Sequence, residues 1–116
     1  MTPISEMIAN ALLDHHATVC VSHRSRPPDI DQCVITYGEL CLKANVPGLE
    51  HGVGRFLQEV AEWCVDHGWP PINSLAVNAN SRMPGDSYEL APGCNFLTWH
   101  EEAVRCIVFT GYPPNA

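Results

Sequence analysis

The apolar and polar positions of residues 35–78 predict two helices, a turn between them and a following strand. From about residue 50 to residue 67, apolar residues recur three and four positions apart, which is the spacing of one buried helix face. That buried face comprises Val53, Phe56, Leu57, Val60, Ala61 and Cys64. The opposite face carries mainly Gln58, Glu59, Glu62 and Asp66. Gly68 is a natural residue to follow the last helical turn, and Pro70-Pro71 prevents continuation.

A capping box predicts the start of the shorter, preceding helix. The Thr36 hydroxyl can accept a hydrogen bond from the Glu39 amide, and the Glu39 carboxylate can reach back to the Thr36 amide. We expect this helix to end near Ala44, ahead of Pro47-Gly48. Residues 74–77, beyond the longer helix, alternate as in a strand.

Helices are also predicted at both ends of the chain. Thr2 is suited to cap a first helix and Pro3 to occupy its first position, with the helix ending between residues 15 and 19. Residues 98–101 form a second capping-box pattern that introduces a final helix. The β-branched run at residues 106–110 also suits a strand, so both structures remain open for residues 98–110.

Two polar segments separate these elements. Residues 20–33 are expected to form an exposed loop that carries a small basic cluster of His23, Arg24 and Arg26. Residues 78–97 are rich in turn formers, which predicts a wing, an Ω-like loop or a poorly paired hairpin. The predicted fold is a single α+β domain of residues 1–116, with a winged-helix-like centre, three to four helices and a short β-hairpin wing.

Three short motifs in this order resemble a known family. They are TYGEL at residues 36–40, Pro47-x-x-x-His51-x-Val53-Gly54, and a proline followed by Val77-Asn78. The pattern is similar to TYGELA, PxAARAVG and PCHRVV in the C-terminal domain of O6-alkylguanine-DNA alkyltransferases and alkyltransferase-like proteins. The resemblance covers less than half of the chain and implies a winged helix that contacts DNA, with Tyr37 beside the DNA backbone.

Departures from this family pattern limit what the resemblance implies. The acceptor cysteine of the family falls within residues 70–75, which read PPINSL and contain neither cysteine nor histidine. Alkyl transfer at that position is therefore excluded, because it needs a thiolate with a nearby base. The family's arginine that enters the DNA stack falls on His51, which is mostly neutral at pH 7.

The charge of the chain argues against nucleic acid as the partner. The 116 residues carry a net charge of −7 with only six lysines and arginines, whereas a DNA-binding domain normally presents a basic footprint. An acidic surface suits a basic protein partner instead. No apolar run approaches membrane-spanning length, so no membrane partner is expected. The six cysteines, without a recognisable secretory signal, predict reduced thiols in the cytoplasm.

Candidate chemistry outside the resemblance is sparse. His15, His16, Cys20 and His23 lie close in sequence, but they lack the paired short spacings that are usual in zinc sites. Cys64 and His67 lie three residues apart, although Cys64 belongs to the buried helix face. Nucleotide-binding, hydrolase and metalloprotease motifs are absent. We therefore expect no enzymatic activity, no metal and no cofactor.

The favoured function is a small acidic binding protein that works through protein contacts, such as an inhibitor or adaptor of a nucleic-acid-handling complex. Anti-restriction and anti-CRISPR proteins are comparable in size and charge only. The alternative is a DNA-binding protein of degenerate alkyltransferase-like type. The predicted binding residues for these two functions are Tyr37, His51, Arg55, Trp69, Arg82 and Tyr88.

Overall fold

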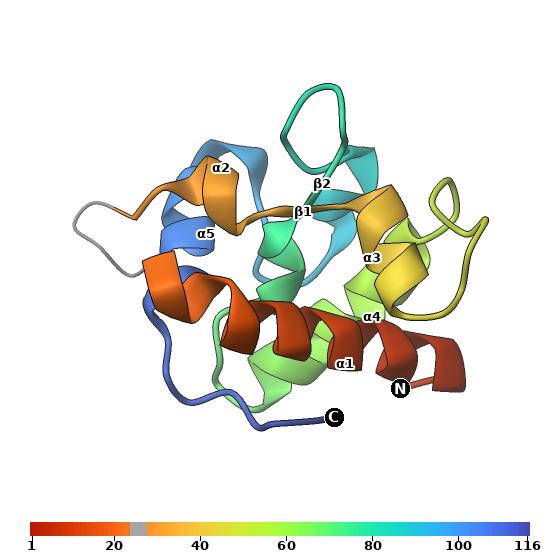
Figure 1. Cartoon of the computed structure of the whole chain (residues 1–116), viewed down its shortest axis with the longest axis horizontal. Coiled ribbons are helices and arrows are strands. Elements are labelled where there is room, and N and C mark those ends of the chain that lie inside the picture. Colours follow the sequence, from red (N-terminus) through yellow and green to blue (C-terminus); the bar gives the residue numbers. More distant parts are fainter. Residues whose placement is uncertain (24–27) are drawn as a thin grey trace.

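The fold is given by a computed structural model, in which residues 1–23 and 28–116 are described. Its α-helices are α1 (Pro3–Thr18), α2 (Ile30–Cys33), α3 (Tyr37–Lys43), α4 (Gly54–Asp66) and α5 (Trp99–Val108). Its strands are β1 (Ile35–Thr36) and β2 (Ala76–Val77), and its 3₁₀ helices are η1 (Cys20–His23), η2 (Ile72–Leu75), η3 (Asp86–Leu90) and η4 (Phe96–Thr98). Helices surround the two short strands on several sides (Figure 1).

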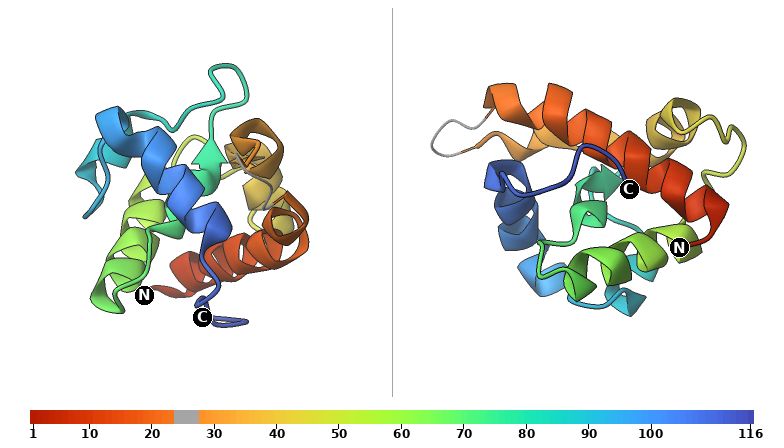
Figure 2. Two further views of the ribbon diagram at one scale, coloured as in Figure 1. Left: turned by 90° about the vertical axis from the view of Figure 1, so that its left-hand side faces the viewer. Right: turned by 90° about the horizontal axis from the view of Figure 1, so that it is seen from below.

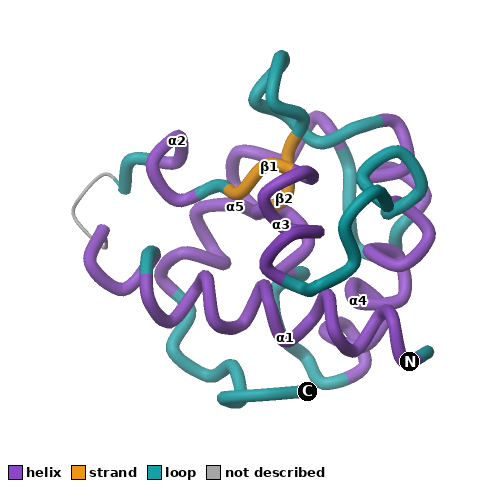
Figure 3. The backbone as a smooth tube through the Cα atoms, turned by 45° about the vertical axis from the view of Figure 1, so that its right-hand side comes forward, coloured by secondary structure: helices purple, strands orange, loops and turns teal. Residues whose placement is uncertain are grey.

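The predicted winged-helix fold with a β-hairpin wing is wrong. Within the described residues, β1 and β2 form a two-stranded parallel sheet with Ile35 opposite Ala76 and Thr36 opposite Val77. A parallel pair needs a long crossover between its strands, and α3, α4 and η2 provide it here (Figure 3). The described chain also holds five α-helices, more than the three or four expected.

The segment expected to form the wing takes another course. After β2 the chain closes on itself, because the Arg82 amide donates to the Asn78 carbonyl at 3.0 Å and the Asn78 amide donates to the Met83 carbonyl at 2.9 Å. Pro84 follows and has no amide hydrogen to give to a strand ladder. The chain then forms η3 and η4, so residues 78–97 contain 3₁₀ turns in place of a hairpin.

The core forms where η2 meets the longer helices. η2 contacts α1, α4 and α5, and it lies between α1 and α4 when the molecule is seen from below (Figure 2). The largest fully buried aliphatic side chains are Ile8, Leu12, Leu40, Ile72, Leu75, Ile107, Val53, Val60 and Val77. These residues come from both ends and the middle of the sequence, so core packing fixes the relative positions of α1, α3, α4, η2 and α5.

Most predicted helix ends are confirmed. The Thr2 hydroxyl accepts from the first turn of α1, and Pro3 follows it. Both hydrogen bonds of the Thr36–Glu39 capping box are present at the start of α3. Gly68 follows α4 with a φ of 76°, a conformation that favours glycine.

The start of α4 differs from its prediction by about one turn. Helical structure was expected near residue 50 but begins at Gly54. Residues before it form tight turns, one of them closed by the Gly52 amide, which donates to the Leu49 carbonyl at 2.9 Å. Val53, at the N-cap, has no side-chain oxygen to accept from the first turn. This turn becomes one wall of the groove described below.

The segment predicted as an exposed loop at residues 20–33 is partly ordered in helical turns. η1 and α2 lie within it, and Cys20 and Cys33 are fully buried. Arg24 and Arg26 of the predicted basic cluster lie outside the described residues. No disulfide joins the cysteines in the described chain. No helix in the part of the chain that the structure describes is long and apolar enough to cross a membrane.

The C-terminal segment is a helix, which resolves the choice left open by its sequence. α5 covers ten residues and buries Ala103, Cys106 and Ile107. The predicted capping box at residues 98–101 is absent, because the Thr98 side chain makes no capping bond to α5. Asn95 instead accepts from the Leu97 amide at 2.8 Å and caps the preceding η4.

The adjacent histidines of α1 link the helix to the rest of the core. His15 Nε2 lies 2.7 Å from the Cys33 carbonyl oxygen, and His16 Nε2 lies 2.7 Å from the Cys106 carbonyl oxygen. Each ring donates a hydrogen bond to a backbone carbonyl that is buried with it. The described residues contain no group of three or more side chains placed to hold a metal ion. The Nε2 atoms of both histidines are engaged by these carbonyls, and the absence of a metal stays a prediction.

Burial of His15 predicts a loss of stability in mild acid. Desolvation lowers the pKa of His15 below the ordinary value of about 6.5, which the unfolded chain keeps. Below about pH 6.5 the unfolded state therefore binds more protons, so the free energy of unfolding falls as pH falls. We expect His15→Gln, which keeps a donor toward Cys33, to flatten this dependence below about pH 6.5. Urea denaturation at several pH values measures the effect, and identical pH profiles for both proteins would contradict it.

Candidate functional site

A groove of about 620 Å³ lies where three distant segments of the chain meet. The first is the start of α3, the second is the turn leading into α4, and the third is the stretch from the end of β2 to the start of η3. α3 and the turn before α4 are neighbours in the ribbon (Figure 1). The residues that line it are Tyr37, Leu49, Glu50, His51, Gly52, Val53, Gly54, Arg55, Asn78, Gly85, Asp86 and Ser87. Three of the six predicted binding residues, Tyr37, His51 and Arg55, are therefore brought together.

Tyr37 ties the first segment to the third. Its hydroxyl oxygen accepts from the Gly85 amide at 2.6 Å, across 48 positions of sequence. Burial raises the pKa of Tyr37 above its ordinary value, so the hydroxyl keeps its proton at neutral pH. A protonated tyrosine hydroxyl that already accepts one bond can still donate another. Tyr37 can therefore position the groove wall and offer a donor to a ligand.

Gly54 allows η3 to approach the start of α4. A Cβ atom at this position would lie 2.3 Å from Ser87 Oγ and 2.7 Å from Ser87 Cβ, closer than real side-chain contacts. The hydroxyl can rotate away, whereas Ser87 Cβ is fixed to the backbone. Glycine is thus required for the close contact between the second and third segments.

The groove carries charges of both signs. His51 and Arg55 are exposed, and Glu50 and Asp86 line the same groove. Arg55 places its guanidinium carbon 4.6 Å from the centre of the Phe56 ring. Among the described lysines and arginines, the other three form ion pairs: Lys43 with Asp14, Arg82 with Asp31, and Arg105 with Glu102. Arg55 is hence the described cation best placed to contact a ligand.

Two further carboxylates that flank this region in sequence are engaged elsewhere. Glu39 bonds the hydroxyl and amide of Thr36, which lowers the pKa of Glu39. Glu59 accepts from the Ser5 hydroxyl at 2.5 Å, and this bond is the main cause of its lowered pKa. Both carboxylates keep their negative charge but do not line the groove, whose own acidic residues, Glu50 and Asp86, offset Arg55.

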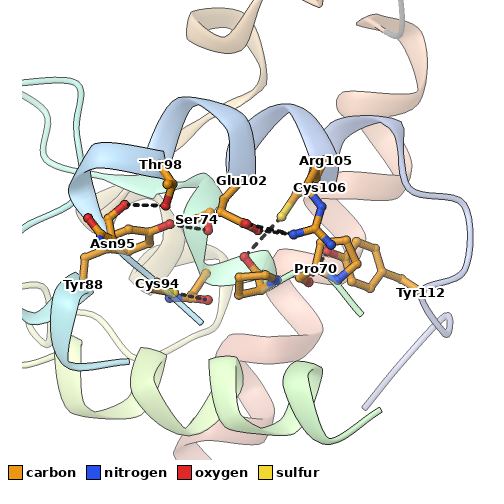
Figure 4. Close-up of polar contacts among 12 residues, drawn as sticks. Pro70, Ser74, Tyr88, Cys94, Asn95, Thr98, Glu102, Arg105, Cys106 and Tyr112 are labelled. Carbon is orange, nitrogen blue, oxygen red and sulfur yellow. Dashed lines mark hydrogen bonds and ion pairs between the residues drawn. The ribbon is translucent and has the colours of Figure 1, made fainter. Parts of the chain in front are cut away.

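The other predicted binding residues do not join the groove. Tyr88 is buried, and its hydroxyl lies 2.8 Å from Ser74 Oγ in the contact between η3 and η2 (Figure 4). Burial raises the pKa of Tyr88 strongly, as expected for a core tyrosine. Arg82 donates to the Asp31 carboxylate and carbonyl, both at 2.9 Å, and so closes the loop after β2 onto α2. Tyr88 therefore belongs to the core, whereas the Arg82 side chain forms an ion pair at the surface and remains 41% exposed.

Trp69 belongs to an aromatic cluster at the other end of α4. Its ring stacks on His67, with centroids 4.4 Å apart, and meets the Trp63 ring edge-on at 5.0 Å. Tyr112 completes the cluster from the C-terminal tail, with its hydroxyl donating to the Pro70 carbonyl at 2.6 Å (Figure 4). Trp69 is half-buried, so part of it remains accessible.

Sequence reasoning missed the contribution of the third segment. Gly85, Asp86 and Ser87 line the groove, yet the sequence pattern placed them in a wing that is not formed. The Pro84-Gly85 turn signal marks where the chain bends back toward Tyr37. That signal locates a turn but not its partner, so the pairing with Tyr37 has no local signature.

The cysteines offer little nucleophilic chemistry. Cys64 is fully buried, and burial raises its pKa to about 11, so the thiol stays protonated at neutral pH. Cys106 is also buried, and its thiol donates to the Pro71 carbonyl. His67 Nδ1 lies 2.8 Å from the Trp63 carbonyl, which occupies one ring nitrogen near Cys64. The groove can therefore bind a ligand through hydrogen bonds and charge. The absence of enzymatic activity stays a prediction.

Comparison of the chain with protein-family models, curated proteins and solved structures finds no match. The resemblance to alkyltransferase-like proteins therefore stays a prediction from short motifs, and functional inference depends on the groove.

Removing the Tyr37 hydroxyl is expected to loosen the groove. Tyr37→Phe leaves the Gly85 amide without its acceptor, which costs about 1–2 kcal/mol in free energy of unfolding. Urea denaturation measures the cost, and the NMR signal of the Gly85 amide reports the local change. His100→Ala, at an exposed position, is the control and should change neither quantity. Unaltered stability and an unaltered Gly85 signal in Tyr37→Phe would refute the assigned bond.

Proposed function

We propose that the protein is a non-enzymatic binding protein that acts through protein contacts at the groove of Tyr37, His51 and Arg55. The observation that carries this proposal is the convergence of these side chains from separate segments on one groove. Exposed His51 and Arg55, half-buried Tyr37 and the carboxylates of Glu50 and Asp86 give a contact surface with both hydrogen-bond donors and acceptors. An inhibitor or adaptor of a nucleic-acid-handling complex in the cytoplasm is the role we favour.

The charge of the protein supports a protein partner with a basic surface. The net charge is −7, and Glu50 and Asp86 offset Arg55 within the groove. Complementary charge speeds association and suppresses wrong partners. The same charges oppose the binding of a polyanion, since phosphate contacts need a local excess of cations.

DNA binding is the second candidate, because Tyr37, His51 and Arg55 are the residues that the alkyltransferase-like resemblance implies. Titration with labelled duplex and single-stranded DNA at about 50 mM and about 200 mM salt separates the two functions. We expect no salt-sensitive binding. Binding at the lower salt that is lost in both Tyr37→Ala and His51→Ala would overturn the protein-contact proposal and establish DNA binding as the function.

A further inference from the structure

The outer side of α4 carries a second, unassigned recess. It has a volume of about 180 Å³ and is lined by Met1, Glu59, Glu62, Trp63 and Asp66. We name the four α4 residues of this recess the α4 outer face. Glu59, Glu62 and Asp66 are spaced three and four residues apart, so their carboxylates project from the same side of the helix.

Glu62 and Asp66 form no ion pair within the described residues, whose side-chain ion pairs are Lys43 with Asp14, Arg82 with Asp31, and Arg105 with Glu102. Glu59 differs, because the N-terminal ammonium of Met1 contributes to its lowered pKa. Glu59 is held by hydroxyl donors from Ser5 and Thr2. Glu62 and Asp66 are exposed, which leaves their carboxylates available to a cation from outside.

An aromatic ring borders the same recess. Trp63 is half-buried, and its indole ring is supported by Trp69 at 5.0 Å and His67 at 5.7 Å between ring centroids. A tryptophan held in this way can accept a cation on its exposed part, since the indole ring is the best aromatic partner for a guanidinium or ammonium group. The ring and the carboxylates thus favour the same ligand chemistry through two different interactions.

We propose that the α4 outer face docks an arginine side chain from a basic segment of the partner protein. This inference rests on the proposed function and specifies the chemistry of the partner. Arginine fits better than lysine, because a planar guanidinium can stack on an indole while it donates to carboxylates.

One partner can cover both the groove and the α4 outer face. Arg55 and Glu62 are seven residues apart on α4, a distance of about 10 Å along the helix axis. A standard interface buries about 800 Å² on each partner, which spans much more than that distance. A single interface of standard size is therefore large enough to cover both the groove and the α4 outer face.

Two-dimensional NMR of the full chain tests this docking face, with a short peptide that alternates arginine and serine as the probe. The indole N–H signal of Trp63 should shift, whereas that of Trp99, which donates to the Ser74 carbonyl at 2.8 Å, should not. The double variant Glu62→Gln with Asp66→Asn should weaken peptide binding about tenfold. Glu89→Gln with Glu101→Gln removes the same charge from other exposed positions and should change binding by less than about twofold. A lysine–serine peptide should bind more weakly than the arginine probe.

Each outcome bears on a different statement. An unmoved Trp63 signal, or equal weakening by the two double variants, would overturn the docking proposal and indicate diffuse attraction to an acidic surface. The amide signals of Gly52 and Gly54 report on the groove in the same spectra. If the glycine signals shift on addition of duplex DNA, the proposed function fails, whether or not the Trp63 signal shifts with the peptide. If the glycine signals do not shift with DNA and the Trp63 signal does not shift with the peptide, only the docking proposal fails.

Discussion

Alanine at position 54 is expected to lower the free energy of unfolding by about 2 kcal/mol and to distort the groove. At an ordinary helical position the same change gains stability, because alanine restricts the unfolded chain more than glycine does. Here the added Cβ would lie 2.7 Å from Ser87 Cβ, which cannot rotate out of the way. The overlap must push η3 away from α4, so the steric cost outweighs the gain in helix propensity. Urea denaturation gives the change in stability, and the Gly85 amide signal reports the displaced wall.

Two further variants isolate this contact. Gly38 lies in α3, where an added Cβ would meet no atom within 4 Å, so Gly38→Ala should be neutral or stabilising. Ser87→Gly removes both clashing atoms, and combining it with Gly54→Ala should recover most of the loss as a favourable coupling energy. Equal effects of alanine at positions 38 and 54, or additive effects of the Gly54 and Ser87 changes, would contradict the close contact.

Replacing His16 with alanine is expected to destabilise the fold by about 3 kcal/mol. The ring is buried, its Nε2 donates to the Cys106 carbonyl at 2.7 Å, and it meets Tyr112 edge-on at 4.9 Å. The substitution removes a buried donor, leaves a cavity between α1 and α5, and loses an aromatic contact. Thermal and urea denaturation measure the loss.

His100→Ala provides the matched control for this change. His100 is exposed on the first turn of α5, so its removal should alter stability by less than about 0.5 kcal/mol. His16→Gln should recover part of the loss if the donated hydrogen bond contributes, since its side-chain amide can reach toward Cys106. A loss in His16→Ala no larger than in His100→Ala would show that this link between α1 and α5 is unimportant.

The helices could be predicted from the sequence because their signals are local. The apolar spacing of residues 53–64 reports the buried face of α4, and the residues at helix ends report capping. The predicted start of α4 is about one turn early, since glutamate at position 50 suits a helix while the turn at Leu49–Gly52 depends on its surroundings. The buried role of His15 and His16 was not apparent, because their carbonyl partners lie 18 and 90 positions away.

The sheet and the third wall of the groove could not be predicted in the same way. Two-residue strands have too few positions to show an alternating pattern. β1 and β2 form only by pairing with each other, and the paired residues lie 41 positions apart in the sequence. Tyr37, His51 and Arg55 were selected by residue type and motif position, and core packing brings them to one groove. Tyr88 and Arg82 were selected by the same reasoning. In the structure, Tyr88 forms a buried hydrogen bond with Ser74, and Arg82 forms an ion pair with Asp31.

Photocrosslinking from the groove tests the central claim most directly. A benzoylphenylalanine at position 51 replaces the exposed His51, and a second protein carries it at Leu42, which is 70% exposed and does not line the groove. In cells that make the protein, we expect a protein adduct of one size from position 51, lost when Tyr37→Ala and Arg55→Ala are added, and no such adduct from position 42. The same adducts from both positions, or adducts with nucleic acid from position 51, would contradict the assignment of the groove as a protein-contact site.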